Sequence, residues 1–407
     1  MINDVIEAAA ELLLPARLLA PEGLRDDLAL VHRDGRILAL PPKRALGEFA
    51  ALPRRELAEC LLAPGFIDLQ ANGGGGALFN DAPSLDTLTT ITRAHRRFGT
   101  TALLATLISD SPERTAQAQV AVAEALKLGL AGLLGLHLEG PHLSPERCGV
   151  HAPEHFRALD QAEVQRLLAA HHGPLLLTLA PEQVEPRLIA ALSEAGVRVF
   201  AGHTAATFEQ VQAALTAGLA GFTHLFNAMP PLAGRAPGPV GAALLDPHSA
   251  CGLIVDGHHL HAAALRLTLR CKPRGRCFLV SDAMPSLGSE QSNFELYGRR
   301  IEVKDGRLQT ADGVLAGAQL DLATAVRNCV QLLDLPLDEA LRMASTYPAE
   351  VMGVADDYGQ LRPGARADLV LLGHDLQVRG SWIGGEFEAA DVCGQQLRPA
   401  AHPAAGP

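Results

Sequence analysis

The middle of the chain alternates short apolar segments with amphipathic helical patterns, and this alternation limits the possible folds more than any other feature. Eight apolar runs of strand length occupy residues 65–69, 101–108, 133–138, 175–179, 197–201, 221–225, 252–255 and 277–280. Helical patterns lie between them, for example at 84–98, 113–128, 159–170 and 207–219. A doubly wound open sheet has fewer strands and usually a glycine-rich phosphate turn, so the pattern predicts a closed α/β fold, a (β/α)₈ barrel of the TIM type.

The two ends of the chain differ from the middle because they show strand patterns without helices. These patterns occur at 16–39, 361–373 and 381–389. They predict a small β-sandwich domain formed by both chain ends, residues 1–62 and 356–407, with the barrel at 63–355. Residues 297–314 break the alternation around an Asp305-Gly306 turn, which predicts a hairpin inserted after the eighth strand.

The composition restricts the class of protein. The 407 residues are 48% hydrophobic and 19% charged, and the net charge of −11 argues against nucleic acid or an anionic membrane as the main partner. No apolar run approaches the ~20 residues of a membrane span. Asp4 and Glu7 precede any basic residue, and the seven cysteines form no C-x-x-C pair. We therefore expect a soluble, reduced, cytoplasmic protein without a signal peptide.

Polar side chains recur where the predicted barrel strands end. They are Asp68, Gln70 and Asn72, then His137 and Glu139, then His203, His224 and Asn227, then Asp256, His258 and His259, and finally Ser281 and Asp282. A strand buried in a parallel sheet is normally apolar throughout, and the carboxyl ends of barrel strands carry the active site. These positions therefore predict one shared site.

Three of these residues form a candidate metal site. Glu139, His203 and His224 offer one carboxylate and two imidazoles from separate strands, which suits catalytic zinc with a position left for water. We expect one divalent ion per subunit, zinc first, with iron, cobalt and manganese as alternatives. Asp282 is the candidate general base. The competing interpretations are hydrogen-bonded core histidines and a buried aspartate that caps a loop.

Several motifs resemble a known family over almost the whole chain, from about Ala16 onward. They are PGFIDLQANGGGGALFND (64–81), LHLEGPHLS (136–144), GVHAPEHF (149–156), AGHTAAT (201–207), THLFNAMPPLAGR (223–235), LIVDGHHLH (253–261), LVSDAM (279–284) and LAGA (315–318). Together they resemble the N-acetylglucosamine-6-phosphate deacetylases of the amidohydrolase superfamily. EGP, HLFNAMPPL and DGHH are the most specific parts, whereas PGFID is shared more widely in the superfamily.

The resemblance implies an amidohydrolase-type barrel enzyme of amino-sugar catabolism, which removes acetate from N-acetylglucosamine 6-phosphate. It implies that Glu139, His203 and His224 bind the metal and that Asp282 accepts and returns the proton. It assigns substrate contacts to Val150, His151, Asn227, Ala228, Arg235, Asp256, Gly257, His258, His259, Leu315, Ala316 and Gly317. Because Arg235 lies in a Pro- and Gly-rich loop (230–239), we also expect a homodimer in which it reaches the neighbouring site.

One departure from the wider superfamily bears on the metal count. Many members carry His-x-His after the first strand and hold a second metal there. Gln70 and Asn72 occupy these positions, and neutral amides are poor ligands for a transition metal, so we expect the single-metal branch.

Two alternatives remain at this stage. A deacetylase of N-acetylgalactosamine 6-phosphate would need the same metal, base and phosphate contacts and would differ in how the 4-hydroxyl is recognised. A non-catalytic assembly protein on the same fold is also conceivable, since fold does not fix function. Retention of all three ligands and of Asp282 argues against it.

Overall fold

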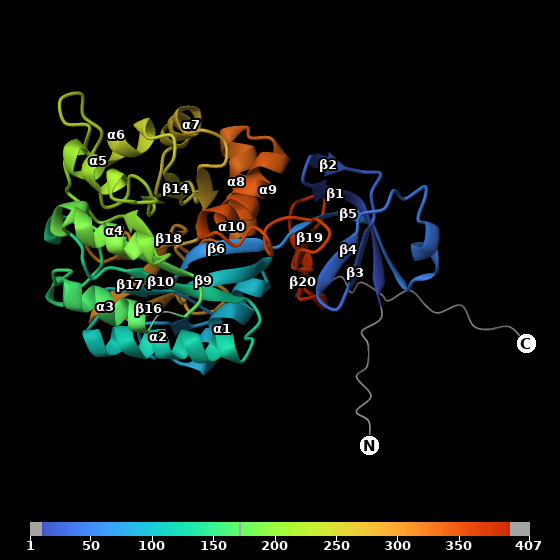
Figure 1. The fold of residues 1–407 in the computed structure, drawn as a ribbon, viewed down its shortest axis with the longest axis horizontal. Coiled ribbons are helices and arrows are strands. Elements are labelled where there is room, and N and C mark those ends of the chain that lie inside the picture. Colours follow the sequence, from blue (N-terminus) through green and yellow to red (C-terminus); the bar gives the residue numbers. More distant parts are fainter. Residues whose placement is uncertain (1–9, 171, 391–407) are drawn as a thin grey trace, which may run out of the picture.

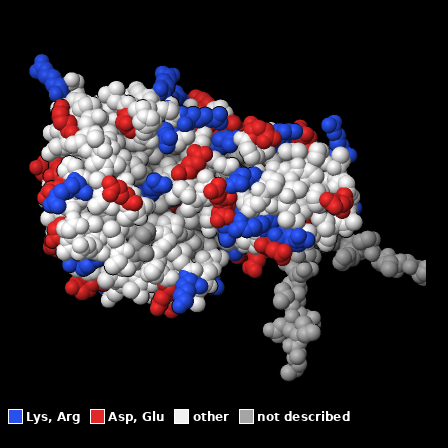
Figure 2. All heavy atoms as spheres, in the orientation of Figure 1, with Lys and Arg blue, Asp and Glu red and all other residues white. Residues whose placement is uncertain are grey.

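The computed structural model describes residues 10–170 and 172–390 of the 407. Figure 1 shows a large part, in which helices surround a central sheet, beside a smaller part made of strands. Acidic and basic side chains are interspersed over the face shown in Figure 2, so neither sign of charge gathers there. No described helix has both the length and the apolar character that crossing a membrane requires.

The large part is built on eight parallel strands. They are β6 (Phe66–Ala71), β9 (Thr100–Ile108), β10 (Leu133–Glu139), β11 (Leu175–Leu179), β12 (Arg198–Ala201), β13 (Gly221–Phe222), β14 (Ala250–Leu253) and β15 (Cys277–Leu279), hydrogen-bonded in this order. A parallel bridge from Ala71, at the end of β6, to Ala283, just after β15, joins the two edges of the sheet, and Ala283 also pairs with Ala318. The predicted strand count and barrel class are thereby confirmed.

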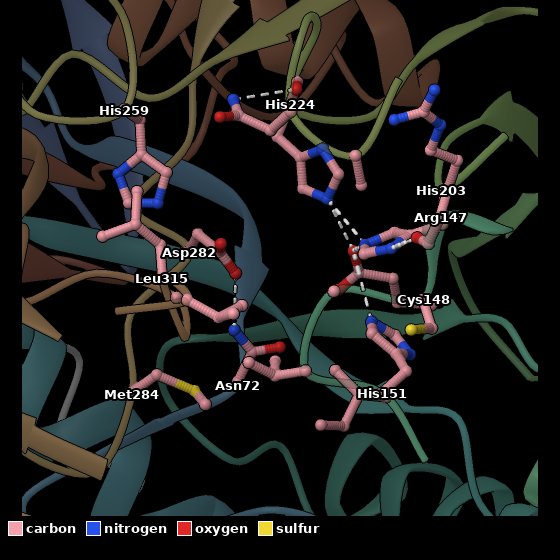
Figure 3. A pocket seen from close by; sticks show the side chains of 18 of the residues that line it. Asn72, Arg147, Cys148, His151, His203, His224, His259, Asp282, Met284 and Leu315 are labelled. Atoms are coloured by element: carbon pink, nitrogen blue, oxygen red, sulfur yellow. Dashed lines mark hydrogen bonds and ion pairs between the residues drawn. The ribbon is translucent and has the colours of Figure 1, made fainter. Parts of the chain in front are cut away.

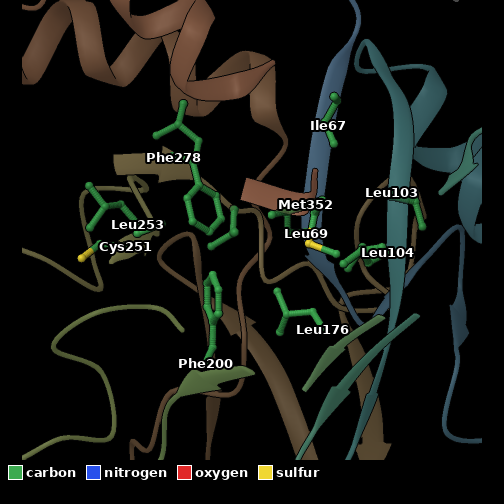
Figure 4. Close-up of a cluster of buried hydrophobic side chains, with 14 of the residues drawn as sticks. Ile67, Leu69, Leu103, Leu104, Leu176, Phe200, Cys251, Leu253, Phe278 and Met352 are labelled. Atoms are coloured by element: carbon green, nitrogen blue, oxygen red, sulfur yellow. The ribbon is translucent and has the colours of Figure 1, made fainter. Parts of the chain in front are cut away.

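Helices pack around this sheet. They are α1 (Leu85–Arg96), α2 (Pro112–Lys127), α3 (Gln161–Ala169), α4 (Pro186–Glu194), α5 (Phe208–Thr216), α6 (Gly238–Leu245), α7 (Ala262–Cys271), α8 (Leu322–Leu333), α9 (Leu337–Ala344) and α10 (Thr346–Met352). Local sequence sets several starts, for example Thr207 and Gln210 form a reciprocal capping box at α5. Inside the barrel Phe200 and Phe278 pack edge to face at 6.2 Å, next to Leu176 and Leu253 (Figure 4).

Strands from both chain ends form the smaller part. One sheet has the order β21-β20-β19-β5-β1-β3-β4, and β2 pairs with β1. The strands are β1 (Glu11–Ala20), β2 (Gly23–Arg25), β3 (Leu30–Arg33), β4 (Arg36–Ala39), β5 (Arg54–Pro64), β19 (Leu369–Leu372), β20 (Val378–Ile383) and β21 (Glu386–Ala389). Trp382 is fully buried in its core. The domain boundaries at 62 and 356 stay a prediction.

A small antiparallel sheet follows the eighth barrel strand. It comprises β16 (Asn293–Leu296), β17 (Arg299–Lys304) and β18 (Arg307–Thr310). The predicted hairpin around Asp305 is the β17–β18 pair. The third strand, β16, lies before the predicted start at residue 297. The sequence does not reveal it because Leu296 is its one buried residue, so it has no apolar pattern. Leu296 and Leu308 belong to one buried apolar cluster with Met284, so the insertion is attached to the segment that follows β15.

Candidate metal centre and active site

A cavity of about 400 Å³ opens where the barrel strands end (Figure 3). Its walls include residues that end or closely follow six barrel strands, namely Asn72, Ile108, Glu139, His203, His224 and Asp282. The loops above the barrel add Arg147, Cys148, Val150, His151, Asn227, Ala228 and His259, and the inserted segment adds Leu315 and Gly317. Most of the sequence-based candidates thus meet at one end of the barrel, as the strand-end pattern predicts.

The three predicted ligands touch one another at the cavity floor. Glu139 Oε1 lies 3.1 Å from His203 Nε2 and 2.9 Å from His224 Nε2, and the two imidazole nitrogens are 3.1 Å apart. Ligand atoms at tetrahedral corners around an ion about 2.0–2.1 Å away would be separated by about 3.3 Å. His151 is the next neighbour, with Nε2 4.0 Å from Glu139 Oε1.

The chemistry of this group of side chains fits a cation. His203 Nδ1 donates to the carbonyl oxygen of Arg147 at 2.9 Å, so the neutral ring presents the Nε2 lone pair to Glu139 and His224. Burial opposes ionisation of Glu139, but positive charge on the side of His203 and His224 holds its pKa well below the usual value, so the group is a carboxylate. Lone pairs and a carboxylate facing one another need a positive charge between them, and a divalent ion supplies it.

Asp282 is held beside the ligands but is not among them. Its Oδ1 accepts hydrogen bonds from Asn72 Nδ2 at 2.7 Å and from Gln70 Nε2 at 3.1 Å. Gln70 Nε2 also donates to Glu139 Oε2 at 3.1 Å. Burial, and then the Glu139 charge, raise the pKa of Asp282 to about 7. The two amides therefore act as donors that fix carboxylates, and Oδ2 of Asp282 is left as a proton acceptor.

His151 presents a proton to the cavity. Its Nδ1 accepts from the backbone N–H of Ser109 at 3.3 Å and lies 2.9 Å from Ser109 Oγ, so the neutral ring carries its hydrogen on Nε2. Burial, followed by the neighbouring His203, holds the pKa of His151 well below its usual value. A neutral imidazole with Nε2–H can donate to a substrate carbonyl oxygen.

A buried belt of polar groups lies beneath the ligands. His137 Nε2 is 2.8 Å from Thr178 Oγ1, which is 2.6 Å from Thr223 Oγ1. On the other side Thr106 Oγ1 lies 3.4 Å from His137 Nδ1 and accepts from the N–H of Ala71 at 3.0 Å. The belt joins five strands or strand ends and fixes the backbone from which Glu139 and His224 project.

The comparison with known proteins gives the family. A model described as the Amidohydrolase family matches residues 61–387. The chain belongs to the amidohydrolase family. The predicted resemblance is confirmed at this level, and the matched range contains every barrel strand and every cavity residue named above.

Relatives of this amidohydrolase include deacetylases of two sugar phosphates. The N-acetylgalactosamine-6-phosphate deacetylase of Shewanella sp. (strain ANA-3) is 40% identical over 91% of this chain and 94% of that protein. The human N-acetylglucosamine-6-phosphate deacetylase is 38% identical over 89% and 91%. The crystal structure of the Pasteurella multocida N-acetylglucosamine-6-phosphate deacetylase aligns with a TM-score of 0.90 and 34% identity over 93% of this chain and all of that one.

Some predicted substrate contacts of this amidohydrolase lie away from the cavity wall. Arg235 is exposed, and Ala316 is fully buried behind Leu315. Asp256 instead holds His259, whose Nδ1 lies 2.6 Å from its Oδ2. Gly257 forms the turn between them with a φ of +78°, and the exposed His258 accepts from Arg307.

Two features of the site escaped the sequence reasoning. Arg147 and Cys148 line the cavity from a loop without periodicity, so no sequence pattern marked them. His203, His224 and Asp282 have positive φ values of 47°, 30° and 50°. Such backbone conformations are costly for side chains other than glycine, and they cluster at functional sites. They turn each chain sharply after its strand and aim the side chain across the barrel mouth.

Proposed function

We propose that this amidohydrolase removes the acetyl group of an N-acetylhexosamine 6-phosphate, with N-acetylglucosamine 6-phosphate as the primary substrate, giving the amino-sugar phosphate and acetate. The observation that carries the proposal is the convergence of Glu139, His203 and His224 on one point, with Asp282 held separately at the same cavity. A proton donor, His151, faces the same space. The names of the relatives support the class of substrate.

The chain's own side chains account for the proton movements. A divalent ion held by the three ligands would polarise the acetamide carbonyl and make water more acidic. Asp282 Oδ2 accepts a proton from the attacking water as its oxygen bonds to the carbonyl carbon. His151 Nε2–H donates a hydrogen bond to the carbonyl oxygen. Asp282 then returns the proton to the amine nitrogen as the C–N bond breaks, so that acetate and the free amine leave.

The metal count is expected to be one ion per chain. Gln70 and Asn72 point their amide N–H groups at Glu139 and Asp282, so these positions donate hydrogen bonds where a second metal would need lone pairs. Zinc is our first choice, with iron, cobalt and manganese as alternatives. Metal analysis of fully active protein measures this directly. A stoichiometry of two, with both ions needed for activity, would contradict it.

The choice of sugar is tested by comparing two substrates. The relatives include deacetylases of both the gluco and the galacto compound, at 38% and 40% identity. We expect acetate release from both, with the higher kcat/KM for N-acetylglucosamine 6-phosphate. A much higher value for N-acetylgalactosamine 6-phosphate would reassign the substrate and leave the chemistry intact. Release from neither would overturn the proposed function.

We propose that the protein is a homodimer in which Arg235 binds the substrate phosphate in the neighbouring subunit. An antiparallel bridge between Ala233 and Ala236 places Arg235 in a tight, exposed turn before α6, away from its own cavity. A guanidinium fork matches phosphate oxygens, so the turn can complete the site of the neighbouring chain.

Arg235→Ala is expected to lower kcat/KM for the phosphorylated sugar by about 10–100-fold, the loss of one charge-assisted hydrogen bond. The loss should be much smaller for N-acetylglucosamine, which has no phosphate. Equal losses for both sugars would make the role structural. Mixed dimers of Arg235→Ala and Asp282→Asn subunits show whether Arg235 acts in its own subunit or in the neighbouring one. If it acts in the neighbouring subunit, each mixed dimer has one intact site and activity recovers. If activity does not recover, Arg235 acts in its own subunit.

A further inference from the structure

Arg147 carries a positive charge at the cavity that the proposed chemistry does not use. It is the last residue of a short 3₁₀ helix, Pro145–Arg147, in the loop after β10, and it lines the cavity. Figure 3 shows its side chain on the wall that also carries His203. Among the described residues on the cavity wall, Arg147 is the one lysine or arginine.

The guanidinium of Arg147 lacks the partners that a neighbouring arginine has. Its Nε is buried and makes no hydrogen bond within residues 10–170 and 172–390. Arg157, in the same connection, also has an unpartnered Nε, but its terminal nitrogens donate to the Asp110 carbonyl at 2.7 Å and to Glu163 at 3.3 Å. No such bonds are formed by Arg147 in the described part of the chain. A partly buried cation without a counter-charge is costly unless a ligand supplies one.

The backbone of this loop is anchored, so the charge is placed before substrate arrives. The carbonyl oxygen of Arg147 accepts from His203 Nδ1 at 2.9 Å, and Ser144 N–H donates to the His203 carbonyl at 2.9 Å. Gly149 has a φ of +59°, and a Cβ there would lie 3.3 Å from His203 Cε1. The loop is therefore held against a metal ligand through its main chain, while the Arg147 side chain is free to bind another group.

The charges around the cavity bear on which ligand Arg147 can bind. Glu139, Asp282 and the exposed Glu146 contribute carboxylates to the wall, and the whole chain carries a net charge of −11. A sugar phosphate brings about −1.5 to −2 further charges. A divalent ion at the three ligands would offset the charges of Glu139 and Asp282, but the phosphate also needs a cation with hydrogen-bond donors where it lies against the wall, next to Glu146.

We propose that Arg147 binds the substrate phosphate from within the same subunit and so selects phosphorylated over neutral sugars. The proposal rests on the function proposed above and adds a contact that works alongside Arg235 of the neighbouring chain. The carbonyl oxygen of Arg147 also accepts from His203, so the proposed phosphate contact is tied to a metal ligand on another strand end.

The test compares phosphorylated and neutral substrate in Arg147→Ala. The ratio of kcat/KM for N-acetylglucosamine 6-phosphate to that for N-acetylglucosamine should fall by about 10–100-fold. Arg147→Lys keeps the charge without the planar fork and should give an intermediate ratio. Arg93→Ala removes an exposed arginine from α1, remote from the cavity wall, and should leave the ratio unchanged.

A second measurement covers the case in which Arg147→Ala folds poorly. Inorganic phosphate is titrated as an inhibitor of N-acetylglucosamine turnover by wild type and Arg147→Gln, and the variant should need about tenfold more phosphate or higher. The proposal would be overturned if the Arg147 variants lost kcat/KM equally on both sugars while retaining metal, or if phosphate inhibited them as it does wild type. The proposed function would still stand in either case, provided that the wild type turns over the sugar phosphate. Absence of wild-type turnover on either sugar phosphate would overturn both.

Discussion

Asp282→Asn is expected to lower kcat by about 10²–10⁴ or more, since this side chain serves as both base and acid. The replacement keeps the shape of the residue, and its amide oxygen can still accept from Asn72 and Gln70 as Asp282 Oδ1 does. What is lost is the proton-accepting oxygen that faces the cavity. Steady-state kinetics with metal analysis on the same preparation measures the effect, and the metal content should stay at the wild-type level.

A matched control for this variant is Asp305→Asn. Asp305 is exposed in the β17–β18 turn, where its φ of +51° is one that asparagine also tolerates. We expect wild-type kinetics from the control. Full metal and near-normal turnover in Asp282→Asn would remove the residue from the mechanism.

His203→Ala or His224→Ala is expected to remove bound metal and activity together. Each ring supplies one of the nitrogens that face Glu139 within 3.1 Å, whereas the next imidazole nitrogen, His151 Nε2, lies 4.0 Å from Glu139 Oε1. Loss of a residue that only orients a ligand costs about 10–100-fold in metal affinity or activity, so loss of a ligand should cost more. Metal content and acetate release, measured across a zinc titration, should fall in parallel.

His248→Ala is the control for the ligand variants. His248 is exposed in the loop before β14 and makes no contribution to the cavity wall. It should keep both metal and turnover. A His203 or His224 variant that loses metal yet keeps full turnover would refute metal-dependent chemistry at this site.

The barrel was predictable because its determinants are local. Buried strands such as β9 and β10 are mostly apolar along their length, and several helices between them, such as α1 and α2, have a side-chain cap at the first turn. β16 escaped prediction because exposed strands with polar residues lack that pattern. The side-by-side placement of β1 and β5 with β19 depends on contacts between distant segments, which periodicity does not encode.

The site was partly predictable for a related reason. Polar residues at the ends of apolar strands marked Glu139, His203, His224 and Asp282, since burial makes such residues conspicuous. The donor roles of Gln70 and Asn72, and the carbonyl contact between Arg147 and His203, depend on three-dimensional placement. The sequence excluded the two amides as metal ligands but contained no sign of what they hold.

The most direct test of the account is acetate release from N-acetylglucosamine 6-phosphate by wild-type protein before and after metal removal. We predict release by the metal-loaded protein, loss of release after treatment with a chelator, and recovery on adding one equivalent of zinc per chain. Unchanged release from protein verified to contain no metal would contradict the central claim, as would absence of release with zinc, iron, cobalt or manganese.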